Sequence, residues 1–230
     1  MMPTAVIIPA LNEAGAIAGV VRDACAQDVT WVIVADNGST DGTADLARQA
    51  GALLVREPRR GYGYACAAGT AMAFDLGARL LVYLDGDHSS LPAEMPRLLD
   101  PLREDRADLV LGSRVLGRIS ERAMPVHQRL GNRLSSWLIT QLYGVRVTDL
   151  GPYRAIRGDL LRDLHMQEMT FGWPTEMMVK AARRGARITE APVSWQRRVA
   201  GQSKVSGSVR GSLLAAYYIL DVTLRYAFFP

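Results

Sequence analysis

Short apolar runs that recur along the first half of the chain constrain its fold more than any other feature. They are rich in Val, Ile and Leu, and polar residues or glycine follow each one. The runs cover residues 5–8, 31–35, 52–55, 80–84 and 109–111. Segments between them, rich in Ala and Leu, predict helices over residues 14–26, 43–50, 62–77 and 93–104. Strands that are apolar on both faces belong in a sheet covered by helices, so we predict an α/β fold with a doubly wound, mostly parallel central sheet and helices on both faces.

The second half of the chain is less regular. We expect helices over 126–142 and 174–184, and short strands over 145–148, 153–157 and 187–198. Residues 1–208 are predicted to form one domain. Residues 209–230 then add an apolar or amphipathic C-terminal helix, with Leu213, Tyr217, Leu220 and Leu224 on one face. Such a face packs on its own domain, on a second copy of the chain as a homodimer, or on a membrane surface.

The residues just past the strands indicate where a ligand binds. Pro9, Asn12 and Glu13 follow the first run, Asp36 the second and Gly61 the third. In a doubly wound sheet, ligands bind in a crevice at the carboxyl ends of the strands. The polar residues therefore predict a binding site at this edge.

The fourth run ends in Asp85-Gly86-Asp87. Two carboxylates one residue apart can hold Mg²⁺ or Mn²⁺, which prefer oxygen ligands and are usually shared with substrate phosphates. Gly86 lets the backbone approach a ligand closely. Phosphatases with an aspartyl nucleophile use a similar motif, but on their first strand and with a downstream Asp-Asp pair that this chain lacks. A Rossmann oxidoreductase is also disfavoured, because the glycines at 61 and 63 have no third partner.

Charge is divided unevenly along the chain. Residues 1–110 carry 9 basic and 15 acidic side chains, whereas residues 111–210 carry 17 and 7. Of the 27 basic residues, 25 are Arg, whose forked guanidinium suits phosphate. Interleaved aromatics and a recognisable nucleic-acid motif are missing, so we expect no nucleic-acid partner and instead a phosphate ligand or an anionic surface.

Seven segments together resemble the family 2 glycosyltransferases of GT-A fold. They are residues 6–13 (VIIPALNE), 36–41 (DNGSTD), 61–63 (GYG), 85–87 (DGD), 112–114 (GSR), 148–154 (TDLGPYR) and 201–204 (GQSK). The last three are most similar to the dolichyl- or polyprenyl-phosphate glycosyltransferase branch. The resemblance implies a nucleotide-diphosphate sugar donor, a divalent metal (Mg²⁺ or Mn²⁺) and inversion at the anomeric carbon.

The resemblance also assigns donor and metal residues. Those expected at the donor are Pro9, Asn12, Glu13, Asp36, Gly61, Asp85 and Gly86. Asp85 is expected against the ribose or the metal, and Asp87 as a metal ligand with a catalytic role. The branch often has a third ligand, Gln, at the position of Ser89, so His88 or water is expected to complete the metal shell.

Two kinds of acceptor remain open. A phosphate monoester is already an anion at pH 7 and needs no base, and Arg114, Arg129 and Arg133 could hold it. A hydroxyl acceptor requires a general base, for which Asp149 and Glu176 are the candidates.

A lid is expected where basic residues flank the Gly- and Ser-rich segment 201–208. Arg197, Arg198 and Lys204 would close it on phosphates.

The leading hypothesis is an inverting, metal-dependent glycosyltransferase. It would move a hexose from a UDP- or GDP-linked sugar to a polyprenyl phosphate. One alternative is transfer to a small soluble hydroxyl acceptor such as a glycerate, and another is a catalytically silent sugar-nucleotide binder. The first residues lack the basic stretch of a signal peptide, and the two cysteines suit reduced thiols. We therefore expect a cytoplasmic protein, at the inner face of the membrane.

Overall fold

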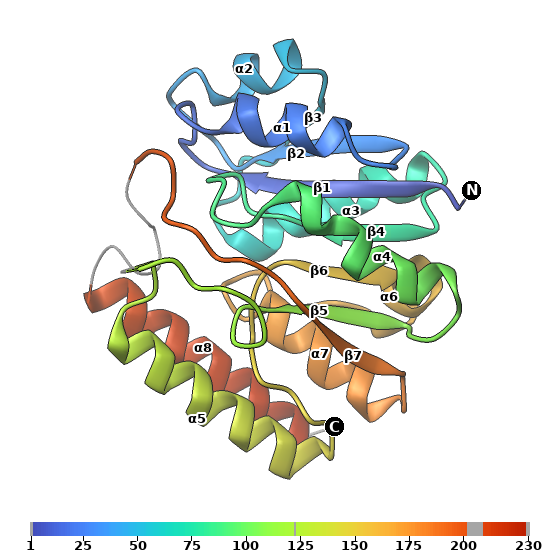
Figure 1. The fold of residues 1–230 in the computed structure, drawn as a ribbon, viewed down its shortest axis with the longest axis vertical. Helices are drawn as coiled ribbons and strands as arrows, with labels where there is room; N and C mark the ends of the chain where they lie inside the picture. Colours follow the sequence, from blue (N-terminus) through green and yellow to red (C-terminus); the bar gives the residue numbers. More distant parts are fainter. Residues whose placement is uncertain (1, 122, 202–208, 229–230) are drawn as a thin grey trace.

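A seven-stranded sheet with the strand order β3-β2-β1-β4-β6-β5-β7 forms the centre of the protein (Figure 1). The computed structural model describes residues 2–121, 123–201 and 209–228. The first-half elements are β1 (Thr4–Ala10), α1 (Ile17–Cys25), β2 (Trp31–Asp36), α2 (Thr43–Gln49), β3 (Leu53–Arg56), α3 (Tyr62–Asp75), β4 (Leu80–Tyr83), α4 (Met95–Arg103) and β5 (Leu109–Ser113). The five predicted strands and four predicted helices of this half are all present.

The second half supplies the remaining strands and the helices of the lower part in Figure 1. Its elements are α5 (Val126–Tyr143), β6 (Arg154–Arg157), α6 (Gly158–Leu164), α7 (Trp173–Arg183), β7 (Ile188–Pro192) and α8 (Val209–Phe228). Strand β6 runs antiparallel to both β4 and β5, and the other pairs are parallel. The predicted doubly wound, mostly parallel sheet is confirmed.

Three local predictions were wrong. No strand forms over 145–148, because the backbone N–H groups of Thr148 and Asp149 donate to the Glu190 side chain instead of to a neighbouring strand. The strand expected over 187–198 ends at Pro192. Helix α6 was missed, since it begins at a glycine, which usually marks a break.

Alternation along β1 shows why both faces of the sheet are covered. Val6 and Ile8 belong to one apolar core with α1 and α4, while Ala5 and Ile7 belong to a second core with α3 and α7. Successive residues of a strand point to opposite faces, and all four are fully buried. The two cores hold the strands rigidly, so the loops at their carboxyl ends have fixed anchors.

Helices α5 and α8 lie side by side at the edge of the molecule, and α8 also contacts α7 (Figure 1). Helix α8 buries Ala215, Val222 and Thr223. The face predicted to be apolar does not pack on its own domain, since Leu213 is 66% and Tyr217 61% accessible. None of the helices in the described part of the chain is both long and apolar enough to cross a membrane.

Candidate active site

A cleft of about 240 Å³ opens at the carboxyl ends of β1, β2 and β4. Most of the predicted donor and metal residues line it, together with one residue of the predicted lid. These are Pro9, Glu13, Gly61, Asp85, Gly86, Asp87 and Arg198. The rule that ligands bind at the strand ends therefore located this cleft from the sequence, and we call it the donor cleft.

Two predicted donor residues lie outside this lining and shape its walls. Asn12 has φ 52°, and its side-chain oxygen accepts a hydrogen bond from Thr40 N–H at 2.8 Å. Asp36 is buried and accepts a hydrogen bond from Ser39 N–H at 3.1 Å. Both tie the loop after β1 and the loop after β2 into fixed shapes. Asn37, next to Asp36, lines the cleft.

The two carboxylates of the Asp-Gly-Asp motif share the floor of the donor cleft. Burial, the neighbouring Asp87 and Glu13 raise the pKa of Asp85 well above its ordinary value, while Arg114 and Arg198 act in the opposite direction. Asp87 accepts hydrogen bonds from the backbone N–H and the hydroxyl of Ser89, at 3.0 and 2.6 Å. The motif is therefore held in place at an electrostatic cost.

Arg198 brings positive charge to the same floor. Its guanidinium pairs with Glu13 at 2.7 Å and lies 3.8 Å from Asp87. Arg60 also lines the cleft and is exposed. A diphosphate entering here would meet arginines from two different segments.

The carboxylate oxygens in the donor cleft fit a divalent cation that is shared with substrate phosphates. His88 lies outside the cleft lining and its Nε2 is bonded to Asp23 of α1 at 2.9 Å, which leaves water to complete a metal shell. Within the described ranges, no group of three or more His, Cys, Asp or Glu side chains could hold a metal. Two carboxylates suit Mg²⁺ or Mn²⁺, which usually keep waters and take phosphate oxygens as further ligands.

A second, basic cavity of about 730 Å³ lies between the loop after β5 and helix α5. Arg114, Arg129 and Arg133 all line it, as predicted for a phosphate site. Arg114 lies over the Trp195 ring, 4.9 Å from its centroid. Since Arg129 and Arg133 are exposed, their charges are available to a ligand.

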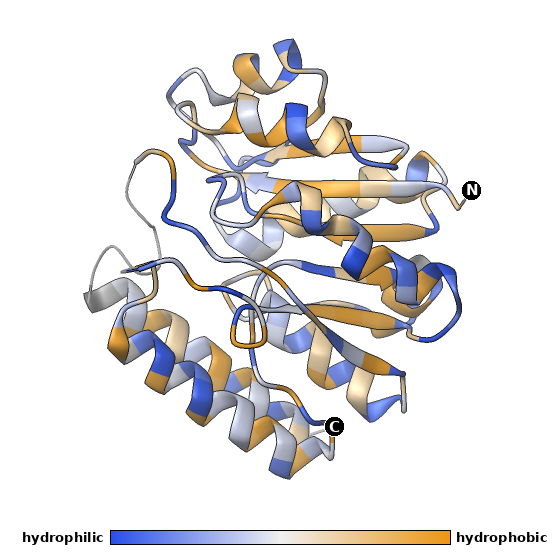
Figure 2. Ribbon diagram, in the orientation of Figure 1, coloured by the Kyte–Doolittle hydropathy of each residue, from blue (hydrophilic) through white to orange (hydrophobic). Residues whose placement is uncertain are grey.

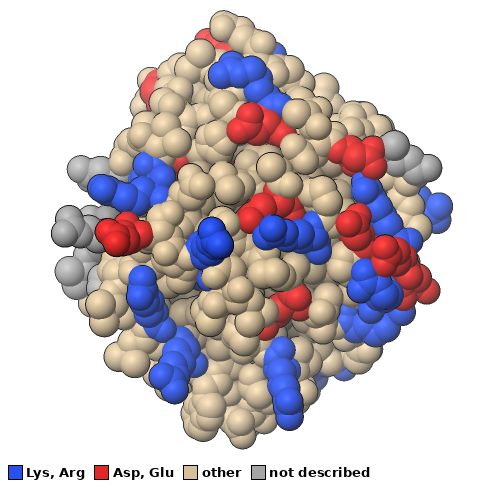
Figure 3. All heavy atoms as spheres, in the orientation of Figure 1, with Lys and Arg blue, Asp and Glu red and all other residues tan. Residues whose placement is uncertain are grey.

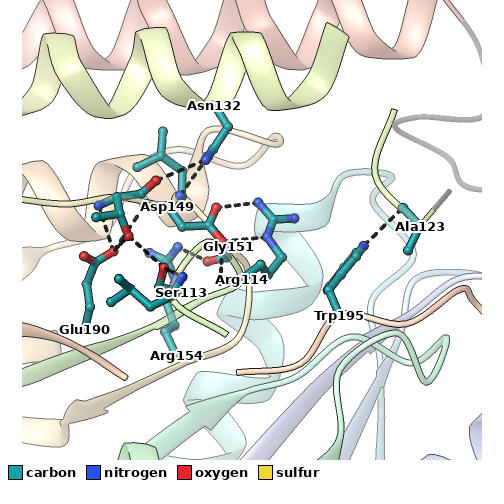
Figure 4. Close-up of polar contacts among 12 residues, drawn as sticks. Ser113, Arg114, Ala123, Asn132, Asp149, Gly151, Arg154, Glu190 and Trp195 are labelled. Carbon is teal, nitrogen blue, oxygen red and sulfur yellow. Dashed lines mark hydrogen bonds and ion pairs between the residues drawn. The ribbon is translucent and has the colours of Figure 1, made fainter. Parts of the chain in front are cut away.

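Asp149 clamps Arg114, as Figure 4 shows. Its two oxygens accept hydrogen bonds from the guanidinium at 2.7 and 2.6 Å, and also from the Arg114 backbone N–H at 2.7 Å. Asp149 is fully buried. A general base must reach the proton that it removes, so the prediction of Asp149 as a base is replaced by a role in orienting Arg114.

Glu176 lies outside both cavities, contrary to the prediction that it serves as a base. It is fully buried, pairs with Lys180 at 2.8 Å and accepts a hydrogen bond from the Tyr226 hydroxyl at 2.6 Å. Of the predicted lid residues, Arg197 is exposed and lies outside both linings. Lys204 lies outside the described residues.

Several residues of the site were missed. Arg60 and Asn37 sit next to strand ends, so their position in the sequence could have indicated them. Phe171 also lines the donor cleft, 6.5 Å from the Tyr62 ring, but it comes from the segment before α7 and carries no local signal. Glu190 was missed for a similar reason. Its carboxylate fixes the backbone just before the Asp149 clamp (Figure 4).

The mostly parallel sheet with an acidic cleft at its strand ends is the arrangement of a glycosyltransferase. The sequence model of glycosyl transferase family 2 matches residues 5–164, and the chain belongs to this family. The predicted membership of family 2 is thus confirmed, and six of the seven motifs lie within the matched residues.

Relatives of known name extend over almost the whole chain. An uncharacterized glycosyltransferase of Mycobacterium tuberculosis is 37% identical over 216 residues, which are 94% of each chain. The undecaprenyl-phosphate mannosyltransferase of Micrococcus luteus is 34% identical, over 89% of this chain and 88% of its own. Among solved structures, glucosyl-3-phosphoglycerate synthase of Mycobacterium tuberculosis, with Mn²⁺, UDP and phosphoglyceric acid, has a TM-score of 0.76 at 22% identity and covers 100% of this chain and 80% of that chain. At this identity, the likeness establishes the fold.

The raised pKa of Asp85 makes a prediction about stability without metal. In the folded chain Asp85 keeps its proton at pH values where the unfolded chain has released it, so the free energy of unfolding falls as pH rises above about 4. We expect Asp85→Asn to raise the Tm of the EDTA-treated protein at pH 7.5 by about 2–4 °C, with a smaller gain at pH 4.5. Asp75→Asn, at an exposed position of α3, is the matched control. A gain that does not change with pH would contradict the assignment.

Proposed function

We propose that the chain is an inverting, metal-dependent glycosyltransferase that moves a hexose from a UDP- or GDP-linked donor to a polyprenyl phosphate. The observation that carries the proposal is the position of Arg114. It lines the basic cavity and is close enough to Asp85, in the donor cleft, to lower the pKa of that carboxyl group. The acidic donor cleft and the basic cavity thus lie close enough to interact electrostatically through one guanidinium.

The donor cleft suits a nucleoside diphosphate and its cation. Asp85 and Asp87 would hold the cation, which when bound offsets the charge that develops on the departing diphosphate. Arg198 and Arg60 line the same cleft and add two guanidinium groups for the phosphates. The M. tuberculosis synthase of the same fold, solved with Mn²⁺ and UDP, supports this assignment.

The basic cavity favours a phosphate acceptor over a hydroxyl acceptor. A phosphate monoester has its second pKa near ~6 and attacks as an anion without a base. Both predicted bases, Asp149 and Glu176, are fully buried and engaged by Arg114 and by Lys180. The mannosyltransferase of M. luteus, whose name specifies undecaprenyl phosphate, supports the same choice.

A third cavity, of about 230 Å³, runs between α5 and α8 and continues the basic one. The two share Arg114, Met124 and Asn132 in their linings. Beyond these residues it is lined mainly by small side chains such as Ser135 and Ala215. In this proposal the phosphate rests on the arginines, and the isoprenoid chain leaves between the two helices.

The outer faces of α5 and α8 are proposed to rest on the membrane that holds this acceptor. Exposed apolar side chains recur at helical spacing along each helix. They are Val126, Leu130, Leu134 and Trp137 on α5, and Leu213, Tyr217, Leu220, Leu224 and Phe228 on α8. Figure 2 shows hydrophobic and hydrophilic residues alternating along both helices. Basic side chains are interspersed on this side of the molecule (Figure 3), which suits an anionic surface.

The donor assignment predicts a metal-dependent thermal shift. With Mn²⁺ present, either a UDP-hexose or a GDP-hexose at about 100 times its Kd should raise the Tm by about 5–10 °C. The shift should vanish in EDTA and in Asp87→Ala, since the cation that bridges protein and diphosphate is then lost, and persist in Asp75→Ala. A shift of equal size without metal, or in Asp87→Ala, would overturn the assignment.

The acceptor assignment predicts a selective loss in two arginine variants. Arg129→Ala and Arg133→Ala should each raise the KM for undecaprenyl phosphate by about tenfold or more, because each removes a charged contact to the phosphate. Their affinity for the nucleotide sugar should stay unchanged. Arg146→Ala, at an exposed arginine just after α5, serves as the control. Faster transfer to 3-phosphoglycerate than to undecaprenyl phosphate would favour the soluble-acceptor alternative.

The membrane assignment predicts co-flotation with anionic phospholipid vesicles. Leu130→Ser and Tyr217→Ser, at sites 69% and 61% exposed, should each reduce the floated fraction by about half or more, because each removes apolar area from the contact. Leu53→Ser, at an exposed site on β3, should have no effect. If the wild-type chain stays unbound but sediments as a dimer that these variants dissociate, the surface is a subunit interface instead.

A further inference from the structure

The segment between α6 and α7, residues 165–172, forms part of the donor-cleft wall. Phe171 lines the cleft beside Tyr62, the first residue of α3. Phe171 therefore depends on the path of a segment far from the metal motif in sequence, since Phe171 lies 84 residues after Asp87 (171 − 87).

The backbone of this segment is packed directly against the start of α3. Gly63 N–H donates to the Met169 carbonyl at 3.1 Å. A Cβ at Gly61 would lie 2.5 Å from the Met169 carbonyl oxygen, and one at Gly63 would lie 2.4 Å from the Glu168 carbonyl oxygen. These contacts leave no room for a larger residue at either glycine, so the segment and the start of α3 are packed backbone to backbone.

Two buried carboxylates fix the segment from behind. Glu176 of α7 accepts hydrogen bonds from the backbone N–H groups of Gln167 and Glu168, at 3.0 and 2.8 Å. Glu168 in turn accepts a hydrogen bond from Thr170 N–H at 3.1 Å. The path that leads to Phe171 thus depends on where these two side chains are held.

Helix α8 holds both of them. The Tyr226 hydroxyl donates to Glu176 at 2.6 Å, and the Arg225 guanidinium pairs with Glu168 at 3.0 Å. Arg225 also pairs with Asp221 at 3.0 Å, one turn earlier on α8. Neither Tyr226 nor Arg225 lines the donor cleft.

We propose that Tyr226 and Arg225 are positioning residues for the nucleotide-sugar site. They act through Glu176 and Glu168 on the segment that carries Phe171, so donor affinity depends on these two contacts of α8. The inference rests on the proposed donor site, but the link from α8 to the segment can be measured without a donor.

Two variants, each of which removes one tyrosine hydroxyl that makes a hydrogen bond at the surface of α8, test the link. Tyr226→Phe removes the hydrogen bond to Glu176, while the control Tyr143→Phe removes one that Tyr143 of α5 donates to the Thr223 carbonyl at 2.6 Å. We expect Tyr226→Phe to weaken binding of UDP or GDP with Mn²⁺, measured by calorimetry, by about three- to tenfold, the effect of one hydrogen bond. Amide hydrogen exchange in residues 165–172 should speed up by a similar factor. Tyr143→Phe should leave both within about twofold, even if its Tm falls equally.

Arg225 gives the second comparison. Arg225→Met should reproduce both effects, and Arg225→Lys should restore most of the affinity, because an ammonium group can still pair with Glu168. The proposal is overturned if Tyr226→Phe lowers the Tm but leaves nucleotide affinity and exchange unchanged, or if Tyr143→Phe alters both as strongly. If the wild-type chain binds neither UDP nor GDP, the proposed function fails, and the exchange rates alone still decide whether α8 holds the segment.

Discussion

The burial of Asp85 beside the carboxylate of Asp87 is the constraint on which the rest of the site depends. Two carboxylates one residue apart, partly removed from water, cost free energy unless positive charge lies close. Arg198 and Arg114 supply that charge from segments far along the chain. The sheet carries this cost because its two apolar cores anchor β4 on both faces. A site that is unfavourable when empty binds a cation more readily than a neutral one would, since the ion removes the strain.

The charges around Arg114, in the second half of the chain, also bear on these two carboxylates. Both carboxylate oxygens of Asp149 bind one edge of the Arg114 guanidinium, and the Trp195 ring covers its planar face. The guanidinium is thereby held in a single orientation beside the basic cavity. A mobile arginine would pair with whichever carboxylate came nearest, including those that the cation needs. The clamp thus keeps the guanidinium of Arg114 in the lining of the basic cavity.

The sequence predicted the first half of the protein well and the second half only in part. Apolar runs mark buried parallel strands directly, and the strand-end rule then located the donor cleft and most of its lining. Roles that depend on tertiary contacts were not predictable. Asp149 and Glu176 look like free acids in the sequence, and only the fold brings Arg114 and Lys180 against them. Phe171 was missed because its segment meets α3 through backbone contacts between glycines and Met169.

Helix α8 combines two properties that are usually separate. Its outer face exposes Leu213 and Tyr217, while its inner face supplies Tyr226 and Arg225 to the carboxylates behind the donor cleft. Anything that covers the outer face acts on the same rigid helix that holds the inner contacts. If covering that face stabilises the contacts of Tyr226 and Arg225 with the two carboxylates, donor affinity must rise. By linkage, a bound donor must then strengthen the surface contact by the same factor. An enzyme whose acceptor resides in a membrane would then bind its donor most tightly where the acceptor is found.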